Sequence, residues 1–166
     1  MFKKPFSINT THKVSGADRK KLRRSLLDKV LGHLSDAEQR EAVLDAVLPS
    51  KAGDLEVSKL VGSRLVLYLL DGLPIIIDPS GKGDLLPSVH ALWASPNLLP
   101  KVYLKHPAVS QYIVGGADLM LPGVNIDMEF PSFKKGDPLS VNVHGQVPSL
   151  HCYAASMHLG IRPTLH

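Results

Sequence analysis

The first clear pattern of hydrophobic and polar positions runs from Asp18 to about Leu34, where apolar residues recur every three or four positions. This spacing is typical of one buried stripe on an α-helix. Ser15, three residues before Asp18, resembles a capping pair and places the helix start nearby. The predicted buried stripe consists of Leu22, Leu26, Leu27, Val30, Leu31 and Leu34.

A second helix is predicted from Ser35 to Pro49. Glu38 stands three residues after Ser35, as in a capping box, and proline ends the segment because a residue before proline is restrained from helical backbone angles. The side chains predicted to pack inward are Val43, Leu44, Val47 and Leu48.

The period then changes from that of helices to that of strands. Residues 55–61 and 64–70 are predicted as strands, and Asp71-Gly72 is a strong hairpin turn leading into a third strand at residues 74–77. Residues 81–84 are expected to form a loop. A short helix is predicted from Pro87, in its first turn, to Ala94.

Two prolines and an asparagine in the segment SPNLLP, residues 95–100, indicate a boundary between two substructures. We therefore expect one domain over residues 1–96 and another over residues 97–166. In the second domain, the pattern predicts a strand at 102–104, a helix at 107–114, and strands near 139–143 and 150–155.

The most informative motif is VGGADLMLPGV, residues 114–124. A glycine pair allows a helix to stop or another backbone to approach, and a Pro-Gly pair sets a tight turn. Alternation along a strand would direct Leu119 and Leu121 one way and Met120 the other. We expect Asp118 to cap or brace the turn, because its charge would repel phosphate.

Charge changes this picture more than composition does. The chain has 166 residues and a net charge of +4, but residues 1–30 alone hold nine Lys/Arg against two Asp, a net charge of +7. The next thirty residues carry −3 and the remainder is neutral. Such asymmetry points to a polyanionic partner, and the first helix offers cations at i, i+4 spacing that could track a phosphate backbone.

Several classes of function find no support in the sequence. No apolar run reaches the roughly 20 residues that cross a bilayer, and no secretory signal follows the start. Cys152 is the only cysteine, which fits a reducing cytosol. The glycines form neither a P-loop nor a dinucleotide motif, and the cluster of His151, Cys152 and His158 lacks the spacing of a metal or nucleophile site. We therefore expect no catalytic residue, cofactor or metal. Trp93 is expected in the core between the domains.

Longer motifs carry a family resemblance. The glycine motif resembles the signature of PUA domains, small RNA-binding β-barrels in which this turn lies against nucleic acid. With MFKK at the start, LLPSVHALWASPNLLP at 85–100 and KKGDPLSVNV at 134–143, the chain resembles the N-terminal region of the ligatin family and, more distantly, the malignant T-cell-amplified sequence proteins. The implied fold class is α+β, a small N-terminal α/β domain followed by a PUA-type β-barrel.

The resemblance also implies a function. Ligatin-like proteins are cytosolic, non-catalytic translation factors that bind the small ribosomal subunit and its rRNA, help place initiator tRNA in the P site and take part in subunit recycling. Family members continue into SWIB-like and SUI-type domains, so we expect this chain to need further domains or a SUI-type partner protein for tRNA delivery. The tail MHLGIRPTLH does not resemble the closing strand of a PUA barrel, so the expected barrel is incomplete at its C-terminus.

Basic residues near the start and the glycine motif together give the expected RNA-binding residues. They are Lys3, Lys4, Arg19, Lys20, Arg23, Arg24, Gly115, Gly116, Ala117, Met120, Pro122 and Gly123. Two other classes stay open: a PUA module serving RNA-modifying chemistry, and a protein-only scaffold.

Overall fold

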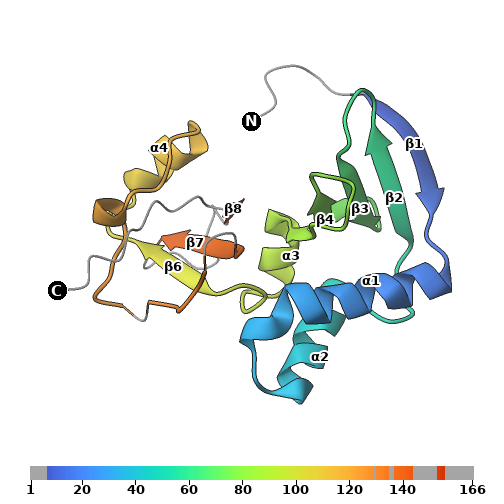
Figure 1. The fold of residues 1–166 in the computed structure, drawn as a ribbon, viewed down its shortest axis with the longest axis horizontal. Helices are drawn as coiled ribbons and strands as arrows, with labels where there is room; N and C mark the ends of the chain where they lie inside the picture. Colours follow the sequence, from blue (N-terminus) through green and yellow to red (C-terminus); the bar gives the residue numbers. More distant parts are fainter. Residues whose placement is uncertain (1–6, 129, 135–136, 144–152, 156–166) are drawn as a thin grey trace. The chain divides into compact units, whose positions relative to one another are not determined.

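The structure is a computed structural model that describes residues 7–128, 130–134, 137–143 and the backbone of 153–155. The chain is α+β and divides into two compact units, Met1–Leu99 and Pro100–His166. The helices and strands of the first unit are β1 (Ile8–Lys13), α1 (Gly16–Lys29), η1 (Leu31–His33), α2 (Ala37–Val47), β2 (Leu55–Leu60), β3 (Val66–Leu70), β4 (Leu73–Asp78), β5 (Leu86–Pro87) and α3 (Val89–Ala94). Those of the second are β6 (Lys101–Leu104), α4 (Val109–Val114), η2 (Leu121–Gly123), β7 (Leu139–Val143) and β8 (Tyr153–Ala155) (Figure 1).

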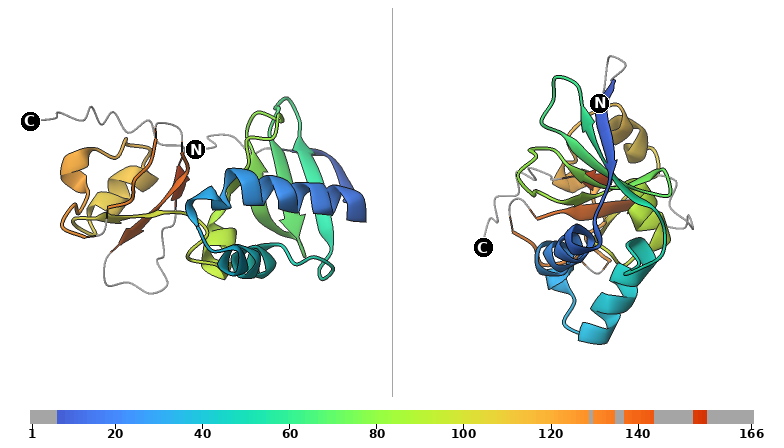
Figure 2. Two further views of the ribbon diagram at one scale, coloured as in Figure 1. Left: turned by 60° about the horizontal axis from the view of Figure 1, so that its bottom comes forward. Right: turned by 90° about the vertical axis from the view of Figure 1, so that its right-hand side faces the viewer.

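In the first unit, five antiparallel strands form a sheet in the order β1-β2-β3-β4-β5. Helix α1 lies across one face of this sheet (Figure 2). The predicted stripe is buried at Leu22, Leu26, Val30 and Leu31, where it meets the apolar face of α2. The hairpin prediction is confirmed, because Asp71 (φ 49°) and Gly72 (φ 81°) both adopt the left-handed backbone of a tight turn between β3 and β4.

Two local predictions for this unit need correction, and one strand has no local signal in the sequence. The second helix is capped by Asp36, which accepts a hydrogen bond from the Glu38 amide, and not by Ser35. The third helix begins at Val89 with Ser88 as its cap, so Pro87 belongs to β5 instead of the first helical turn. Strand β1 was not predicted, because all six of its residues are exposed and show no alternation.

In the second unit, β6 pairs with β7 in parallel and β7 pairs with β8 antiparallel. The core contains Val102, Leu104, Leu119, Val124, Leu139, Val141 and Val143. The segment after η2 extends the sheet edge, since the amide of Asn125 donates to the Tyr103 carbonyl at 2.8 Å and Lys105 donates to Gly123 at 2.9 Å. The expectation about the closing strand of the barrel lies outside the described residues.

Candidate nucleic-acid interface

Helix α1 begins as the sequence predicts. Ser15 is its N-cap, accepting a hydrogen bond from the Asp18 amide and donating one to the Asp18 carboxylate at 2.7 Å. This cap fixes where the helix begins, and residues 19, 20, 23 and 24 all lie in its first turns.

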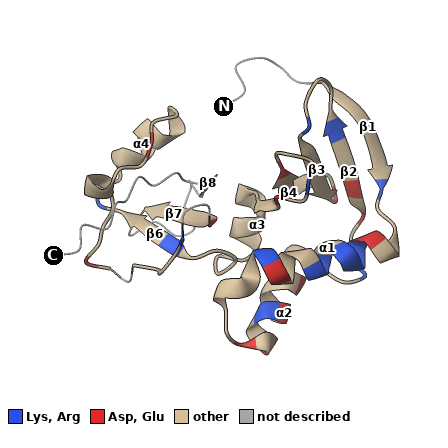
Figure 3. Cartoon of the chain, viewed as in Figure 1, with Lys and Arg blue, Asp and Glu red and all other residues tan. Residues whose placement is uncertain are grey.

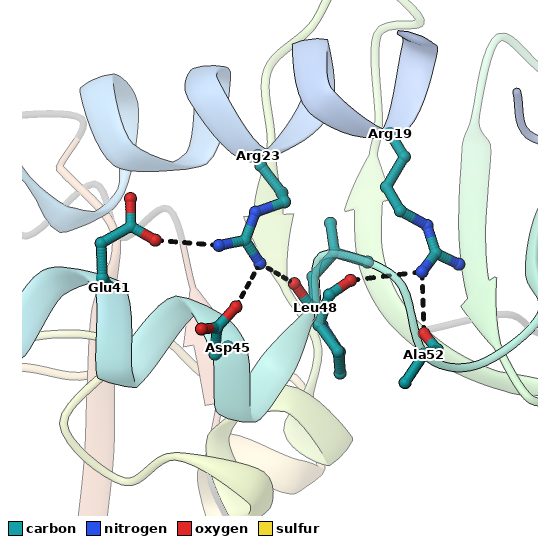
Figure 4. A network of polar contacts seen from close by, with 7 residues as sticks. Arg19, Arg23, Glu41, Asp45, Leu48 and Ala52 are labelled. Atoms are coloured by element: carbon teal, nitrogen blue, oxygen red, sulfur yellow. Dashed lines mark hydrogen bonds and ion pairs between the residues drawn. The ribbon is translucent and has the colours of Figure 1, made fainter. Parts of the chain in front are cut away.

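Arg19 lies on the inner side of α1, with only 8% of the residue exposed. Its guanidinium donates to three backbone carbonyls in the loop after α2, those of Pro49 (3.2 Å), Ala52 (2.7 Å) and Gly53 (2.6 Å). Its hydrogen-bonding capacity is directed into the protein, as Figure 4 shows for two of these contacts.

Arg23 lies one turn further along the same side of α1. It donates to the carbonyl of Leu48, the C-cap of α2, and forms ion pairs with Glu41 (2.9 Å) and Asp45 (2.7 Å) (Figure 4). Carbonyls at a helix C-terminus have no partner within the helix, and a cation there is favoured by the helix dipole. Arg23 therefore caps α2 from outside.

The expectation of four cations on one solvated face is thus wrong for Arg19 and Arg23. At 100° per residue, positions 19, 22, 23 and 26 fall on one side of the helix, so both arginines are in phase with buried Leu22 and Leu26. Their charges are used to join α1 to α2 and the loop that follows it.

Lys20 and Arg24 remain as the exposed pair. Among the described residues, neither forms a hydrogen bond or an ion pair, and they are spaced i, i+4 on the outer side of α1. Figure 3 shows lysine and arginine along this helix. Lys3 and Lys4 lie outside the described residues and stay predictions.

The glycine pair ends α4 in a Schellman motif. The amide of Gly116 donates to Ile113 and that of Ala117 to Tyr112, both at 2.9 Å. Gly116 has φ +96°, and a side chain placed there would meet no atom within 4 Å. The predicted helix stop is therefore confirmed, and the Gly116 backbone is open to solvent.

The Pro-Gly pair behaves differently from the expected turn. Pro122 and Gly123 lie in the 3-10 helix η2, and Gly123 does not have a positive φ. Its constraint is packing, because a Cβ there would lie 3.2 Å from Val109 Cγ1 and 3.3 Å from Leu119 Cδ1.

The residues between the two turns form no strand. Leu119 is buried while Met120 (65%) and Leu121 (44%) are both exposed, so the predicted alternation fails at Leu121. Asp118 forms no hydrogen bond within the described residues, which contradicts the expected bracing role. Ala117, Met120 and Pro122 are exposed, and their role in RNA binding stays a prediction.

Other candidate residues are also placed. Trp93 is 46% exposed and contacts His90 edge to face with ring centroids 5.3 Å apart, and its role in a core between domains stays a prediction.

His151, Cys152 and His158 lie outside the described residues. Within the described part of the chain, no three His, Cys, Asp or Glu side chains gather as a metal site would need. Among the described helices, none has the length and apolarity to span a membrane.

One site was not foreseen from the sequence. A pocket of about 560 Å³ lies between α1, the strands β1 to β3 and the loop after β4, all within the first unit. Its residues come from segments separated by more than fifty positions, and no local pattern brings them together. Lys21 and Lys29 of α1 line it together with Lys82.

Comparison with known proteins finds two family models, one for each part of the chain. The family model of the Pre-PUA-like domain matches residues 2–96, and that of the eIF2D PUA domain matches residues 99–152. Eukaryotic translation initiation factor 2D from Mus musculus is 32% identical and that from Bos taurus 34% identical over 149 residues, or 87% of this chain. The chain spans 24% of the length of either relative.

Solved structures support the fold. A hypothetical protein from Pyrococcus horikoshii superposes with a TM-score of 0.64 at 21% identity, covering 89% of this chain and 83% of that one. A PUA domain protein from Aeropyrum pernix gives 0.62 at 19% identity, covering 92% and 74%. The chain belongs to the Pre-PUA-like domain family and joins that domain to a PUA domain, as in the N-terminal region of eukaryotic translation initiation factor 2D.

Proposed function

We propose that this chain is a non-catalytic RNA-binding module of a cytoplasmic translation factor, which binds the small ribosomal subunit through rRNA. The observation that carries the proposal is the match of both domains, in the same order, to eukaryotic translation initiation factor 2D. Division into a pre-PUA domain over residues 1–96 and a PUA domain over residues 97–166 is part of the proposal. Initiator tRNA placement and subunit recycling are the activities to which this binding contributes, with a SUI-type protein as a partner.

Two surfaces are proposed for RNA, one in each unit. On α1, the exposed Lys20 and Arg24 can neutralise phosphates because no carboxylate of the described chain pairs with them. In the PUA unit, the open backbone at Gly116 lets RNA approach closely, next to exposed Ala117 and Met120. Arg19 and Arg23 are left out of the proposed interface because protein groups already occupy them.

The first test is co-sedimentation of the purified chain with isolated small ribosomal subunits across a salt series. Reversing Lys20 and Arg24 to Glu is expected to weaken binding by about tenfold or more and to flatten the log K against log salt slope by roughly 0.7 per lost phosphate contact. Reversal of Lys51 and Lys59, exposed cations of the same unit, is the charge-matched control. Equal losses of affinity in both variants would show that only the net charge of the chain matters, not the position of these two residues. If the parent chain binds neither subunits nor RNA, a protein-only scaffold is favoured.

The second test concerns the turn in the PUA unit. Gly116→Val is expected to destabilise the chain by on the order of 1 kcal/mol, because a branched residue is strained at φ +96°. Gly62→Val is the matched control, since Gly62 also has positive φ (+69°) and open space around it. We expect similar melting losses in the two variants but a further loss of RNA affinity only for Gly116→Val. Identical RNA affinities would give the turn a purely structural role.

A further inference from the structure

The pocket between α1 and the sheet has an unusual balance of charge. Four lysines line it against one carboxylate, that of Asp18, which already accepts a hydrogen bond from Ser15. The lining lysines are Lys13, Lys21, Lys29 and Lys82. An excess of cations around a concave surface raises the local concentration of anions.

Two of these lysines are already engaged. Lys13 forms an exposed ion pair with Asp54 at 3.2 Å, and Lys29 donates to the Gly83 carbonyl at 2.8 Å. Lys21 and Lys82 form no hydrogen bond or ion pair through their side chains with any described residue. Two uncompensated ammonium groups, one from α1 and one from the loop after β4, therefore line the same cavity.

The loop that carries Lys82 is held in place by Asp78. This carboxylate is buried, at 3% exposure, and accepts hydrogen bonds from the amides of Gly81 (2.9 Å) and Gly83 (2.7 Å). The bond from Lys29 to Gly83 joins the loop to α1. The backbone at Lys82 is thus fixed before any ligand arrives, which lowers the entropy cost of binding.

Tyr68 adds a neutral donor to the pocket. Its side chain is half-buried, and its hydroxyl forms no hydrogen bond with the described residues. Burial, with smaller contributions from Asp78 and Asp18, raises the pKa of Tyr68 above its usual value. Its usual value of 10.0 already keeps the hydroxyl protonated at neutral pH, where it can donate a hydrogen bond to an anion.

The other lining residues include an apolar group, in which Leu22 and Leu85 are each 6% exposed and Val14 and Val57 take part, and the polar side chains of His12 and Ser25. A volume of about 560 Å³ with both apolar and cationic walls exceeds what an inorganic ion needs and lies in the range of small-molecule sites. We propose that this pocket binds a nucleotide, with Lys21, Lys82 and the Tyr68 hydroxyl on its phosphate and the apolar wall against its base or ribose. The inference deepens the proposed function, because in that setting the nucleotide is one unit of the bound RNA. A free nucleotide has the same phosphate chemistry, and the experiment distinguishes the two.

The test of the pocket is calorimetric titration of the full chain with AMP, GMP, CMP and UMP, each compared with its nucleoside. We expect at least one monophosphate to bind ten times or more tightly than its nucleoside. Lys21→Gln with Lys82→Gln is expected to weaken that binding at least tenfold, and Tyr68→Phe a few fold. Lys51→Gln with Lys59→Gln, exposed and outside the pocket, is the matched control and should keep affinity within about twofold. Monophosphates that bind no better than nucleosides, or a pocket double variant that binds like the control, would overturn the proposal.

A second arm uses a labelled single-stranded RNA in fluorescence anisotropy. Competition by the monophosphate, with a loss of RNA affinity in the pocket variant alone, would show that the pocket holds a unit of RNA. Monophosphate binding without competition would show that it holds a free nucleotide. If the chain binds RNA but no monophosphate, the pocket proposal fails and the proposed function stands. If monophosphates bind but RNA and subunits do not, the pocket stands and the proposed function fails.

Discussion

On the side of α1 that faces α2, the cations are arginines, and each is enclosed by protein groups. On the side that lines the pocket, the cations are Lys21 and Lys29, and of these two only Lys21 lacks a polar partner among the described residues. Arg19 reaches three carbonyls and Arg23 reaches one carbonyl and two carboxylates. Lys21 stands between these sites in sequence yet has no polar partner among the described residues. One helix of 14 residues thus carries a structural set and a free set of positive charges.

The chemistry of the two side chains accounts for the difference. A guanidinium offers five donors in a rigid plane and is weakly hydrated, so it can satisfy several fixed carbonyls at once with little loss of solvation. An ammonium is a compact, strongly hydrated charge that suits a ligand arriving from water. When arginines lie in phase with the buried stripe, the net charge of a segment therefore overestimates the number of cations that are available to RNA phosphates.

The largest effect is expected from removing the guanidinium of Arg19. Arg19→Met keeps the aliphatic stem but leaves the carbonyls of Pro49, Ala52 and Gly53 without this donor, which should lower the free energy of unfolding by about 2 kcal/mol. Arg24→Met, on the exposed side, should change it by less than about 0.5 kcal/mol. Urea denaturation followed by circular dichroism measures both, and equal effects would erase the distinction between the two sides of α1.

A smaller effect is expected from the carboxylates that pair with Arg23. Their side chains are 56% and 58% exposed, so Glu41→Gln with Asp45→Asn should lower the free energy of unfolding by less than about 1 kcal/mol. The Leu48 carbonyl still receives a hydrogen bond from Arg23 in this variant. Salt should reduce the difference between variant and parent, since these charges are partly solvated. A loss as large as that of Arg19→Met would show that the ion pairs, not the carbonyl contacts, join the two helices.

Local sequence signals predicted the parts of the fold that depend on few residues. The Ser15 cap and the Asp71-Gly72 turn each depend on contacts within one or two turns of chain, and each is confirmed. The hydrophobic period also predicted four of the six residues of the buried stripe, Leu22, Leu26, Val30 and Leu31. The helix stop at Gly116 is of the same kind, since its two hydrogen bonds join residues three and five positions apart.

Other features depend on partners that are distant in sequence. The i, i+4 spacing of the cations predicts an exposed Arg19, whereas its phase with Leu22 and Leu26 indicates that it is buried, as the structure shows. Its carbonyl partners, thirty or more residues away, could not be predicted from that phase. The pocket requires Lys21, Tyr68 and Lys82 to converge from a helix, a strand and a loop, and periodicity carries no information about such convergence.

The smallest effect on the free energy of unfolding is expected from Tyr68, which lies in β3 and lines the pocket opposite α1. Its pKa is raised, chiefly by burial, so the folded chain retains the phenolic proton at pH values where the unfolded chain has lost it. Below the usual tyrosine pKa of 10.0 both states are protonated and the group adds no pH dependence. As pH rises from there through the pKa of the folded state, unfolding is increasingly favoured and stability falls. Tyr68→Phe has no proton to lose, so its free energy of unfolding should decline less between pH 9 and 11.5 than that of the parent chain. Tyr112→Phe, at a residue 70% exposed, is the control and should decline like the parent. Urea denaturation at a series of pH values compares the three chains. Parallel curves for all of them would show that the Tyr68 hydroxyl is as well solvated as an exposed one, which would contradict its partly buried position in the pocket.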